Sequence, residues 1–147
     1  MALKITLKAN ERLIIGGAVI TNGSNRSDLI VENSVPVLRE KEIMSEEDAE
    51  TPCSRIYFVI QLMYVDEKKL DEHHRTYWEL VKGVVAAAPS LLGLIDQISD
   101  DILKCRYYQA LKKAKQLMGH EKEVIDNVRN KVAGNLQDGT QSYGIGP

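Results

Sequence analysis

Short apolar runs separated by turn signals fill the first 44 residues of the chain. Leu3, Ile5 and Leu7 alternate with polar side chains, and this period of two predicts a half-buried strand. Gly-Gly and Asn-Gly pairs separate the runs that follow, and such pairs are typical of hairpin turns. We therefore expect a compact antiparallel meander with strands at residues 3–7, 12–15, 18–21 and 29–32 and a fifth strand opening at Pro36.

Helical spacing replaces the strand pattern after residue 50. Thr51-Pro52 has the residue types of a helix N-cap and first helical position. Residues 55–65 are apolar nearly all round, which predicts a buried helix, with a buried strand as the alternative. Residues 67–88 then carry one apolar stripe at spacings of three and four, and Pro89 ends this second helix.

Two further helices are expected in the remaining chain. A short apolar helix starts near Ser90, and Ser99-Asp100-Asp101 has the composition of the N-terminus of the next helix. Gly119 is expected to interrupt that helix before helical spacing resumes at residues 121–132. Few apolar residues follow Gly134, which predicts a disordered tail.

These patterns predict an α+β fold, in which a five-stranded antiparallel β domain is followed by about four α-helices. The expected divisions are a β domain at residues 1–48, a helical region at 49–133 and the tail at 134–147.

Composition narrows the class of protein. The chain has 147 residues, 44% of them hydrophobic, and a net charge of −2. An acidic chain is a poor general binder of polyanions, although a local basic surface remains compatible with it. Early charges at Lys4 and Lys8 disfavour a signal peptide, and no apolar run reaches the roughly 18 residues of a membrane span. We expect a cytoplasmic protein in which Cys53 and Cys105 are reduced thiols.

Candidate catalytic and metal-binding residues are sparse. His73 and His74 are adjacent, so on a helix they point about 100° apart and cannot share one ion as an i, i+4 pair can. His74 falls on the apolar stripe, where we expect a hydrogen-bonded, partly buried side chain. The sequence has no nucleophile motif and no phosphate loop in the required strand–helix context, so we expect neither an enzyme nor a metal or cofactor.

Two family resemblances add to this picture. The first 44 residues resemble the RNA-binding CsrA family in the segments Asn10-Glu11, Leu13-Ile14-Ile15-Gly16 and Val37-Leu38-Arg39-Glu40-Lys41-Glu42-Ile43. The chain as far as about residue 130 is more closely similar to the FlbT family of flagellin regulators. The segments that carry this second resemblance are residues 11–23, 35–40 and 55–64.

The FlbT resemblance implies a post-transcriptional regulator of flagellin synthesis. Such a protein binds the 5′ untranslated region of flagellin mRNA and blocks ribosome entry or speeds decay of the message. The alternative is a protein-binding adaptor, in which the helices bind flagellin or another flagellar regulator such as FlaF and the effect on RNA is indirect.

The CsrA resemblance implies a homodimer through residues 1–44, with the first and last strands side by side across the two subunits. RNA would bind there through Arg39, with Lys8 and Lys41 nearby. A guanidinium suits this task because it pairs bidentately with phosphate or with a guanine edge. The CsrA family ends its first strand with two basic residues, whereas this chain has Leu7-Lys8. The other interpretation of Arg39 is an ion pair with a local glutamate.

A second basic segment lies in the helical region. Residues 104–115 contain five cations and no acidic residue, with Tyr107 and Tyr108 between the cations. Cations beside aromatic rings suit single-stranded RNA, whereas cations along an amphipathic helix also occur simply as a solvated face. The cations are Lys104, Arg106, Lys112, Lys113 and Lys115.

Overall fold

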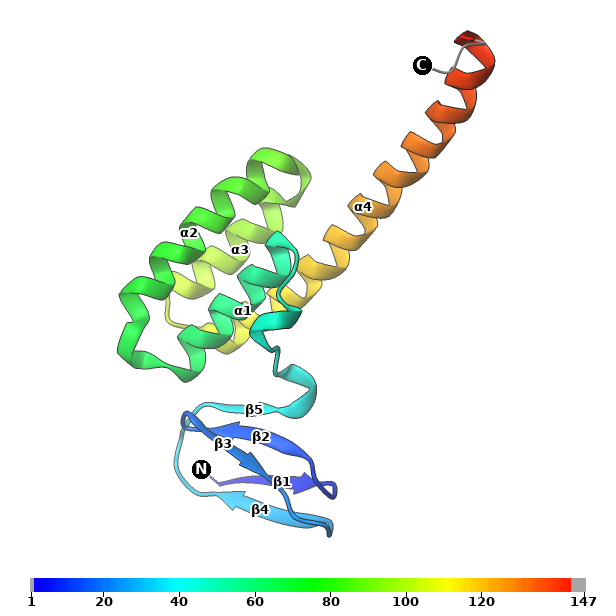
Figure 1. The fold of residues 1–147 in the computed structure, drawn as a ribbon. Helices are drawn as coiled ribbons and strands as arrows, with labels where there is room; N and C mark the ends of the chain where they lie inside the picture. The colour runs from blue at the N-terminus through cyan, green and yellow to red at the C-terminus, as the bar shows by residue number, and fades with distance from the viewer. Residues whose placement is uncertain (1, 144–147) are drawn as a thin grey trace.

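The computed structural model describes the backbone of residues 2–143 and the side chains of residues 2–126 and 130. A β half made of five strands lies against one end of a helical half (Figure 1). This arrangement confirms the predicted α+β fold. The strands are β1 (Leu3–Leu7), β2 (Arg12–Ile15), β3 (Ala18–Thr21), β4 (Ser27–Val31) and β5 (Val37–Arg39).

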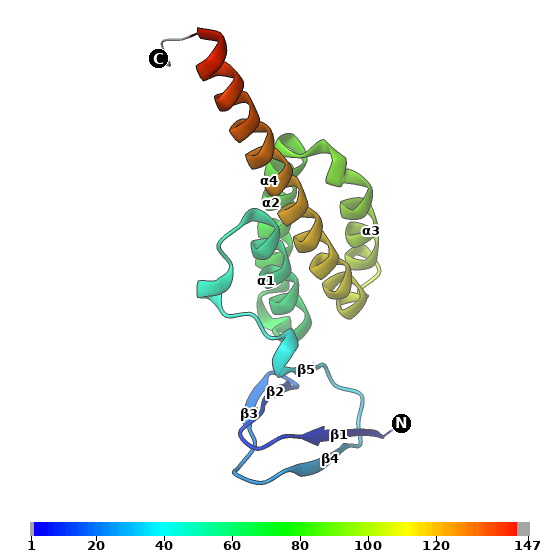
Figure 2. The same ribbon diagram turned by 90° about the vertical axis from the view of Figure 1, so that its right-hand side faces the viewer.

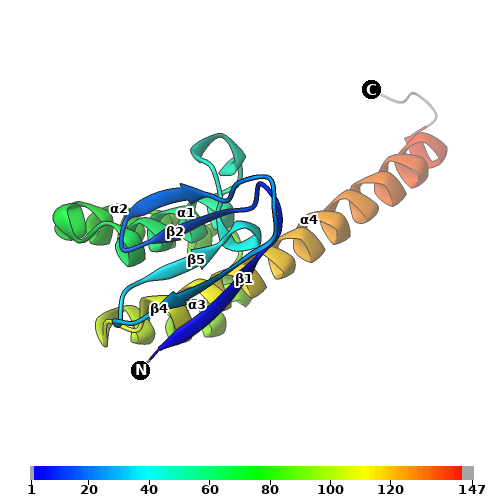
Figure 3. The same cartoon turned by 90° about the horizontal axis from the view of Figure 1, so that it is seen from below.

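The strands form two small antiparallel sheets and not one continuous meander. β1 pairs with β4, while β2 pairs with both β3 and β5 (Figure 3). The chain crosses from β3 to the other sheet at Asn22, whose side-chain amide donates to the carbonyl oxygens of Lys8 at 2.7 Å and Asn25 at 2.9 Å. Within one chain β1 and β5 thus belong to different sheets, and their pairing between two subunits stays a prediction.

Tight turns between the strands depend on residues that tolerate positive φ. Asn10 has a φ of 62° between β1 and β2, and the Gly16-Gly17 hairpin between β2 and β3 has φ values of 55° and 87°. A Cβ on Gly17 would also lie 3.3 Å from the carbonyl oxygen of Val65. The hairpin therefore approaches the helical half more closely than a side chain at this position would comfortably allow.

β2 lies between two hydrophobic clusters, which explains its run of three apolar residues, Leu13-Ile14-Ile15. Leu13 is fully buried with Ile5 and Leu7 in a cluster inside the β half. The next residue, Ile14, faces the other way and joins Leu38 of β5 in the core of the helical half. Side chains of the β half thus form part of the helical core.

The first helix, α1 (Pro52–Val65), is the central element of the helical half. Thr51 caps it, accepting a hydrogen bond from the backbone N–H of Ser54, and Pro52 occupies the first turn as predicted. Ile56 and Ile60 are fully buried between the neighbouring helices α2 and α4. The sequence prediction of a buried helix here is confirmed.

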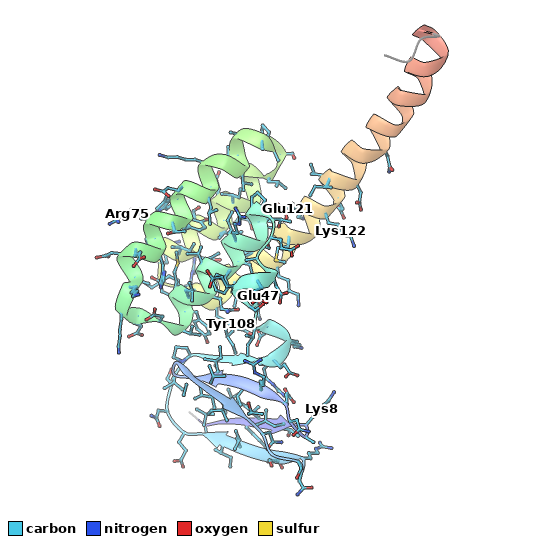
Figure 4. The ribbon with its side chains drawn as sticks, in the orientation of Figure 1. Lys8, Glu47, Arg75, Tyr108, Glu121 and Lys122 are labelled. Carbon is cyan, nitrogen blue, oxygen red and sulfur yellow. The ribbon has the colours of Figure 1, made fainter. Side chains whose placement is uncertain are left out.

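Short 3-10 turns connect the remaining helices. The turn at Glu67–Lys69 leads into α2 (Leu70–Ala87), and the turn at Pro89–Leu91 leads into α3 (Leu92–Leu103). The last helix, α4 (Tyr107–Tyr143), packs along α1 and α3 and then continues past them (Figure 2). Glu121 of α4 binds the N-terminus of α1, accepting from the Thr51 hydroxyl at 2.6 Å and from the Cys53 amide at 3.1 Å (Figure 4).

The boundary between α3 and α4 differs from the prediction. Ser99-Asp100-Asp101 lies inside α3 and caps no helix, and the chain turns at Cys105, whose φ is 57°. Asp101 is buried, and its negative charge is balanced by Arg106 at 3.2 Å and Lys113 at 2.7 Å across the corner.

The predicted interruption of the last helix at Gly119 was wrong. α4 continues through Gly119, because the adjoining turn is held by the fully buried Leu117 and an interior glycine costs only about 1 kcal/mol. α4 extends to Tyr143 and so enters the segment 134–147, where a disordered tail stays a prediction. Residues 144–147 of the predicted tail lie outside the described residues.

Candidate nucleic-acid interface

A groove of about 830 Å³ lies where the β half meets α4. One wall comes from the β1–β2 turn and from the end of β5 with the 3-10 turn Glu40–Glu42 that follows it. The other wall is the first three turns of α4, with Tyr57 of α1 between the walls. The lining residues are Lys8, Ala9, Asn10, Glu11, Arg39, Glu40, Lys41, Glu42, Tyr57, Tyr108, Leu111, Lys112 and Lys115.

The groove brings together residues from both predicted basic segments. Lys8, Arg39 and Lys41 lie on the β wall, and Lys112 and Lys115 lie on the α4 wall. Figure 4 shows Tyr108 at the junction of the two halves and Lys8 on the β half. From the sequence, these segments are two separate candidate sites. In the fold they form the two facing walls of one groove.

The other three cations of the helical segment lie outside the groove. Lys104 pairs with Asp100 at 3.1 Å. Arg106 and Lys113 both bind the buried carboxylate of Asp101. These three side chains hold the α3–α4 corner, which explains their charge without a ligand.

Arg39 connects the two sheets of the β half. Its Nη2 donates to the carbonyl oxygen of Thr6 in β1 at 2.7 Å and to the Glu11 carboxylate at 3.1 Å. The Arg39 side chain is 38% exposed to solvent. The pairing with a local glutamate, one of the two interpretations of Arg39, is therefore present, and three of the five guanidinium N–H groups are not used in these bonds.

The Glu11 carboxylate is stabilised in its charged form. A hydrogen bond from the backbone N–H of Lys8 is the main cause and the bond from Arg39 is the second, and together they lower the pKa of Glu11. Only 12% of the Glu11 side chain is exposed. The pair fixes Arg39 at the edge of the groove.

All three carboxylates that line the groove accept hydrogen bonds from the protein. Glu11 binds Lys8 and Arg39, and Glu40 accepts from the backbone N–H of Arg12 at 3.3 Å. Glu42 accepts from the backbone N–H of Arg39 at 3.0 Å and from the Tyr108 hydroxyl at 2.7 Å. Five cationic side chains share the groove with these three carboxylates, so its lining is basic although the whole chain is acidic.

The lysines of the groove are exposed. Across residues 2–126, no salt bridge engages Lys8, Lys41 or Lys115. The ammonium group of Lys112 lies over the Tyr108 ring, 4.9 Å from the ring centre. These side chains can turn toward an anionic ligand without breaking an ion pair.

Two tyrosines, Tyr57 of α1 and Tyr108 of α4, fasten the helical half to the β wall. The hydroxyl of Tyr57 donates to the carbonyl oxygen of Glu42 at 2.5 Å, and burial raises the pKa of Tyr57 to about 12. The bond to Glu42 is the main reason that the pKa of Tyr108 is also raised to about 12. Both hydroxyls stay neutral donors at physiological pH.

Sequence reasoning missed several groove residues. Glu42 and Tyr57 carry no signal of their own, because their role appears only when the two halves meet. The sequence analysis noted Tyr107 and Tyr108 together. Helical spacing distinguishes the two, because Tyr108 shares one face of the helix with Lys112 and Lys115 in an i, i+4, i+7 pattern. Tyr107 points elsewhere and lies within 3.2 Å of His74.

The environments of His73, His74 and Cys53 are explained by hydrogen bonding and burial within the fold. His73 is buried and lies 3.4 Å from Asp66, and His74 is half-buried beside Tyr107, as predicted. Burial raises the pKa of the Cys53 thiol to about 12. In the described part of the chain, no three His, Cys, Asp or Glu side chains gather as metal ligands, and no helix there has the length and apolar content of a membrane span.

Comparison with known proteins assigns the family. The model of the family described as flagellar protein FlbT matches residues 3–125. This chain belongs to the FlbT family. The match spans both halves, so the FlbT sequence pattern includes both walls of the groove.

Named FlbT proteins match over most of their length. The probable flagellum biosynthesis repressor protein FlbT 1 of Bradyrhizobium diazoefficiens is 41% identical over 125 residues, which cover 84% of this chain and 85% of the relative. The flagellum biosynthesis repressor protein FlbT of Caulobacter vibrioides is 36% identical over 136 residues, covering 90% and 96%. A probable FlbT repressor of Rhodopseudomonas palustris is 35% identical over 125 residues, covering 85% and 98%. No solved structure matches this chain.

Proposed function

We propose that this protein represses flagellin synthesis by binding the 5′ untranslated region of flagellin mRNA in the groove between the β half and α4. The names of its FlbT relatives support a regulator of flagellum biosynthesis and not an enzyme. Bound protein would block ribosome entry or speed decay of the message. Its place of action would be the cytoplasm.

The observation that carries this proposal is the convergence of cations on one groove. Lys8, Arg39 and Lys41 face Lys112 and Lys115, and these come from segments more than 60 residues apart in the chain. Binding to a nucleic-acid backbone gains free energy from each phosphate that a cation neutralises. The groove carboxylates, all within the described residues, accept hydrogen bonds from other groups of the protein and form no salt bridge with the groove lysines. The lysine ammonium groups are therefore available for phosphates.

The test is a titration of the flagellin 5′ leader with the purified full-length protein at several salt concentrations. The double variant Lys112→Ala/Lys115→Ala removes two exposed cations from the groove. We expect weaker binding and a salt dependence of log K that falls by about 0.7 for each lysine lost, the value for single strands.

The matched control is Lys82→Ala/Lys122→Ala. It removes the same charge from exposed positions outside the groove, and Figure 4 shows Lys122 farther along α4. Equal loss of affinity in both double variants would mean that RNA binding follows net charge alone and would contradict a site in the groove.

An adaptor function is the second candidate, and the length of α4 favours it. The helix continues well past α1 and α3, which leaves its outer part beyond the bundle (Figure 1). A helix in this position suits binding to flagellin or to another flagellar regulator such as FlaF. Binding through an apolar protein interface depends weakly on salt, so a salt-insensitive complex with no affinity for the leader would favour the adaptor.

A further inference from the structure

The Tyr108 ring is held rigidly in the wall of the groove. Its hydroxyl donates to Glu42 at 2.7 Å, and the ring of Tyr64 lies 5.6 Å away, centre to centre, at a tilt of 41°. The side chain is half-buried, yet it lines the groove together with Lys112. A fixed aromatic surface of this kind loses little conformational entropy when it binds a second flat group.

The group over the Tyr108 ring is the exposed side chain of Lys112. Its ammonium lies 4.9 Å from the ring centre. A cation–π contact at an exposed site is weak, so a better stacking partner can displace the ammonium. The displaced side chain stays within the same groove, where Lys115 lies one turn further along α4.

The size of the groove restricts the ligand. Its volume of about 830 Å³ falls within the range of pockets that hold a small organic molecule, roughly 300–1,000 Å³. An RNA duplex hides the faces of its bases inside the stack, whereas an unpaired nucleotide can place a base on an aromatic side chain.

We infer that the groove takes an unpaired nucleotide of RNA, with its base stacked on Tyr108 and Lys112 turned to a neighbouring phosphate. This inference rests on the proposed function and specifies the kind of RNA that the groove selects. It makes Tyr108 a binding residue, in addition to a side chain that fastens α4 to the β half through Glu42.

The two roles of Tyr108 are separable by substitution. Tyr108→Phe keeps the ring and removes the bond to Glu42, whereas Tyr108→Leu removes both. Stacking predicts that the leucine variant loses affinity for single-stranded leader RNA on the order of tenfold or more, and that phenylalanine rescues most of this loss. A purely structural role predicts that both variants lose affinity together, which would overturn the inference.

Two further measurements complete the test. The same leader segment annealed to its complement should bind the wild-type protein more weakly than the single strand does at equal salt. A leader carrying the fluorescent base 2-aminopurine should be quenched by wild-type protein through stacking, a readout that does not depend on how well the leucine variant folds. Equal affinity for duplex and single strand, or no quenching at any labelled position, would overturn the inference.

Failure of this inference differs from failure of the proposed function. If Lys112→Ala/Lys115→Ala weakens RNA binding while Tyr108→Leu does not, RNA binds in the groove without stacking on Tyr108. If neither RNA form binds the wild-type protein, the proposed function itself fails.

Discussion

Arg39 still has three N–H groups beyond the two that bind Thr6 and Glu11. If these groups contact RNA, Arg39→Ala should cost roughly 1–3 kcal/mol of binding, about a tenfold to hundredfold loss of affinity. Arg39→Lys should recover only part of this loss, because an ammonium lacks the planar fork. The measurement is a titration of the leader at two salt concentrations beside a melting curve.

Arg26→Ala is the matched control for Arg39. Arg26 is an exposed arginine of the same β half and lies outside the groove. Unchanged affinity in a folded Arg39→Ala protein would exclude Arg39 from the binding site and leave Lys8, Lys41 and the lysines of α4 as its cations.

The hydrogen bonds that Glu11 accepts from the backbone N–H of Lys8 and from Arg39 should also give the β half a pH dependence. Folding lowers the pKa of Glu11, so its carboxylate stabilises the folded state above the unfolded pKa of about 4.5. That contribution is lost as the pH falls from 4.5 through the folded pKa. The difference in melting temperature between wild type and Glu11→Gln should be constant from pH 8 to about pH 5 and should shrink below it. A difference that is the same at acidic and neutral pH would contradict this role of Glu11.

Among the elements, α1 packs against both α2 and α4, so we expect its buried side chains to be required for folding. Ile60 is fully buried at its centre, so Ile60→Asp places an unpaired charge in the core. We expect the loss to be comparable with the whole free energy of unfolding, roughly 5 kcal/mol or more, and the protein not to fold. Circular dichroism and solubility check this result. Arg55→Asp is the control on the exposed side of the same helix, and a folded Ile60→Asp protein with an unchanged melting curve would mean that α1 is peripheral.

The elements that the sequence predicted best are those whose signals are local. Thr51 and Pro52 predict the start of α1 correctly, because capping depends only on residues of the first turn. Ser99-Asp100-Asp101 misled the prediction because Asp101 has the residue type of a cap but binds Arg106 and Lys113 across a corner.

The groove depends on contacts that no local pattern records. The family resemblance and the charge pattern of the sequence predicted which cations could line the groove. Only the packing of α4 against the β half separates Lys112 and Lys115, which line the groove, from Lys104, which pairs with Asp100.

At the scale of the whole molecule, the β half exposes apolar side chains that suit a second subunit. Val19 on the edge strand β3 is 62% exposed and Ile30 on β4 is 65% exposed. Uncharged edge strands tend to pair with another chain, so we expect a homodimer through residues 1–44. Light scattering at micromolar concentration should give twice the mass of one chain, and Val19→Glu/Ile30→Glu should give the monomer. A wild-type protein with the mass of one chain would contradict this prediction.

The contact between Glu42 and Tyr108 joins residues that are 66 positions apart, and this separation determines when the groove can exist. A ribosome adds about 5–20 residues per second, so α4 emerges roughly 3–13 s after the β wall. During that interval the nascent chain carries Arg39 without its opposite wall, and Ile14 and Leu38 still lack the helices that cover them. Under the proposed function, a chain whose synthesis stops before α4 has no RNA-binding groove, so only chains that include the start of α4 act on the message.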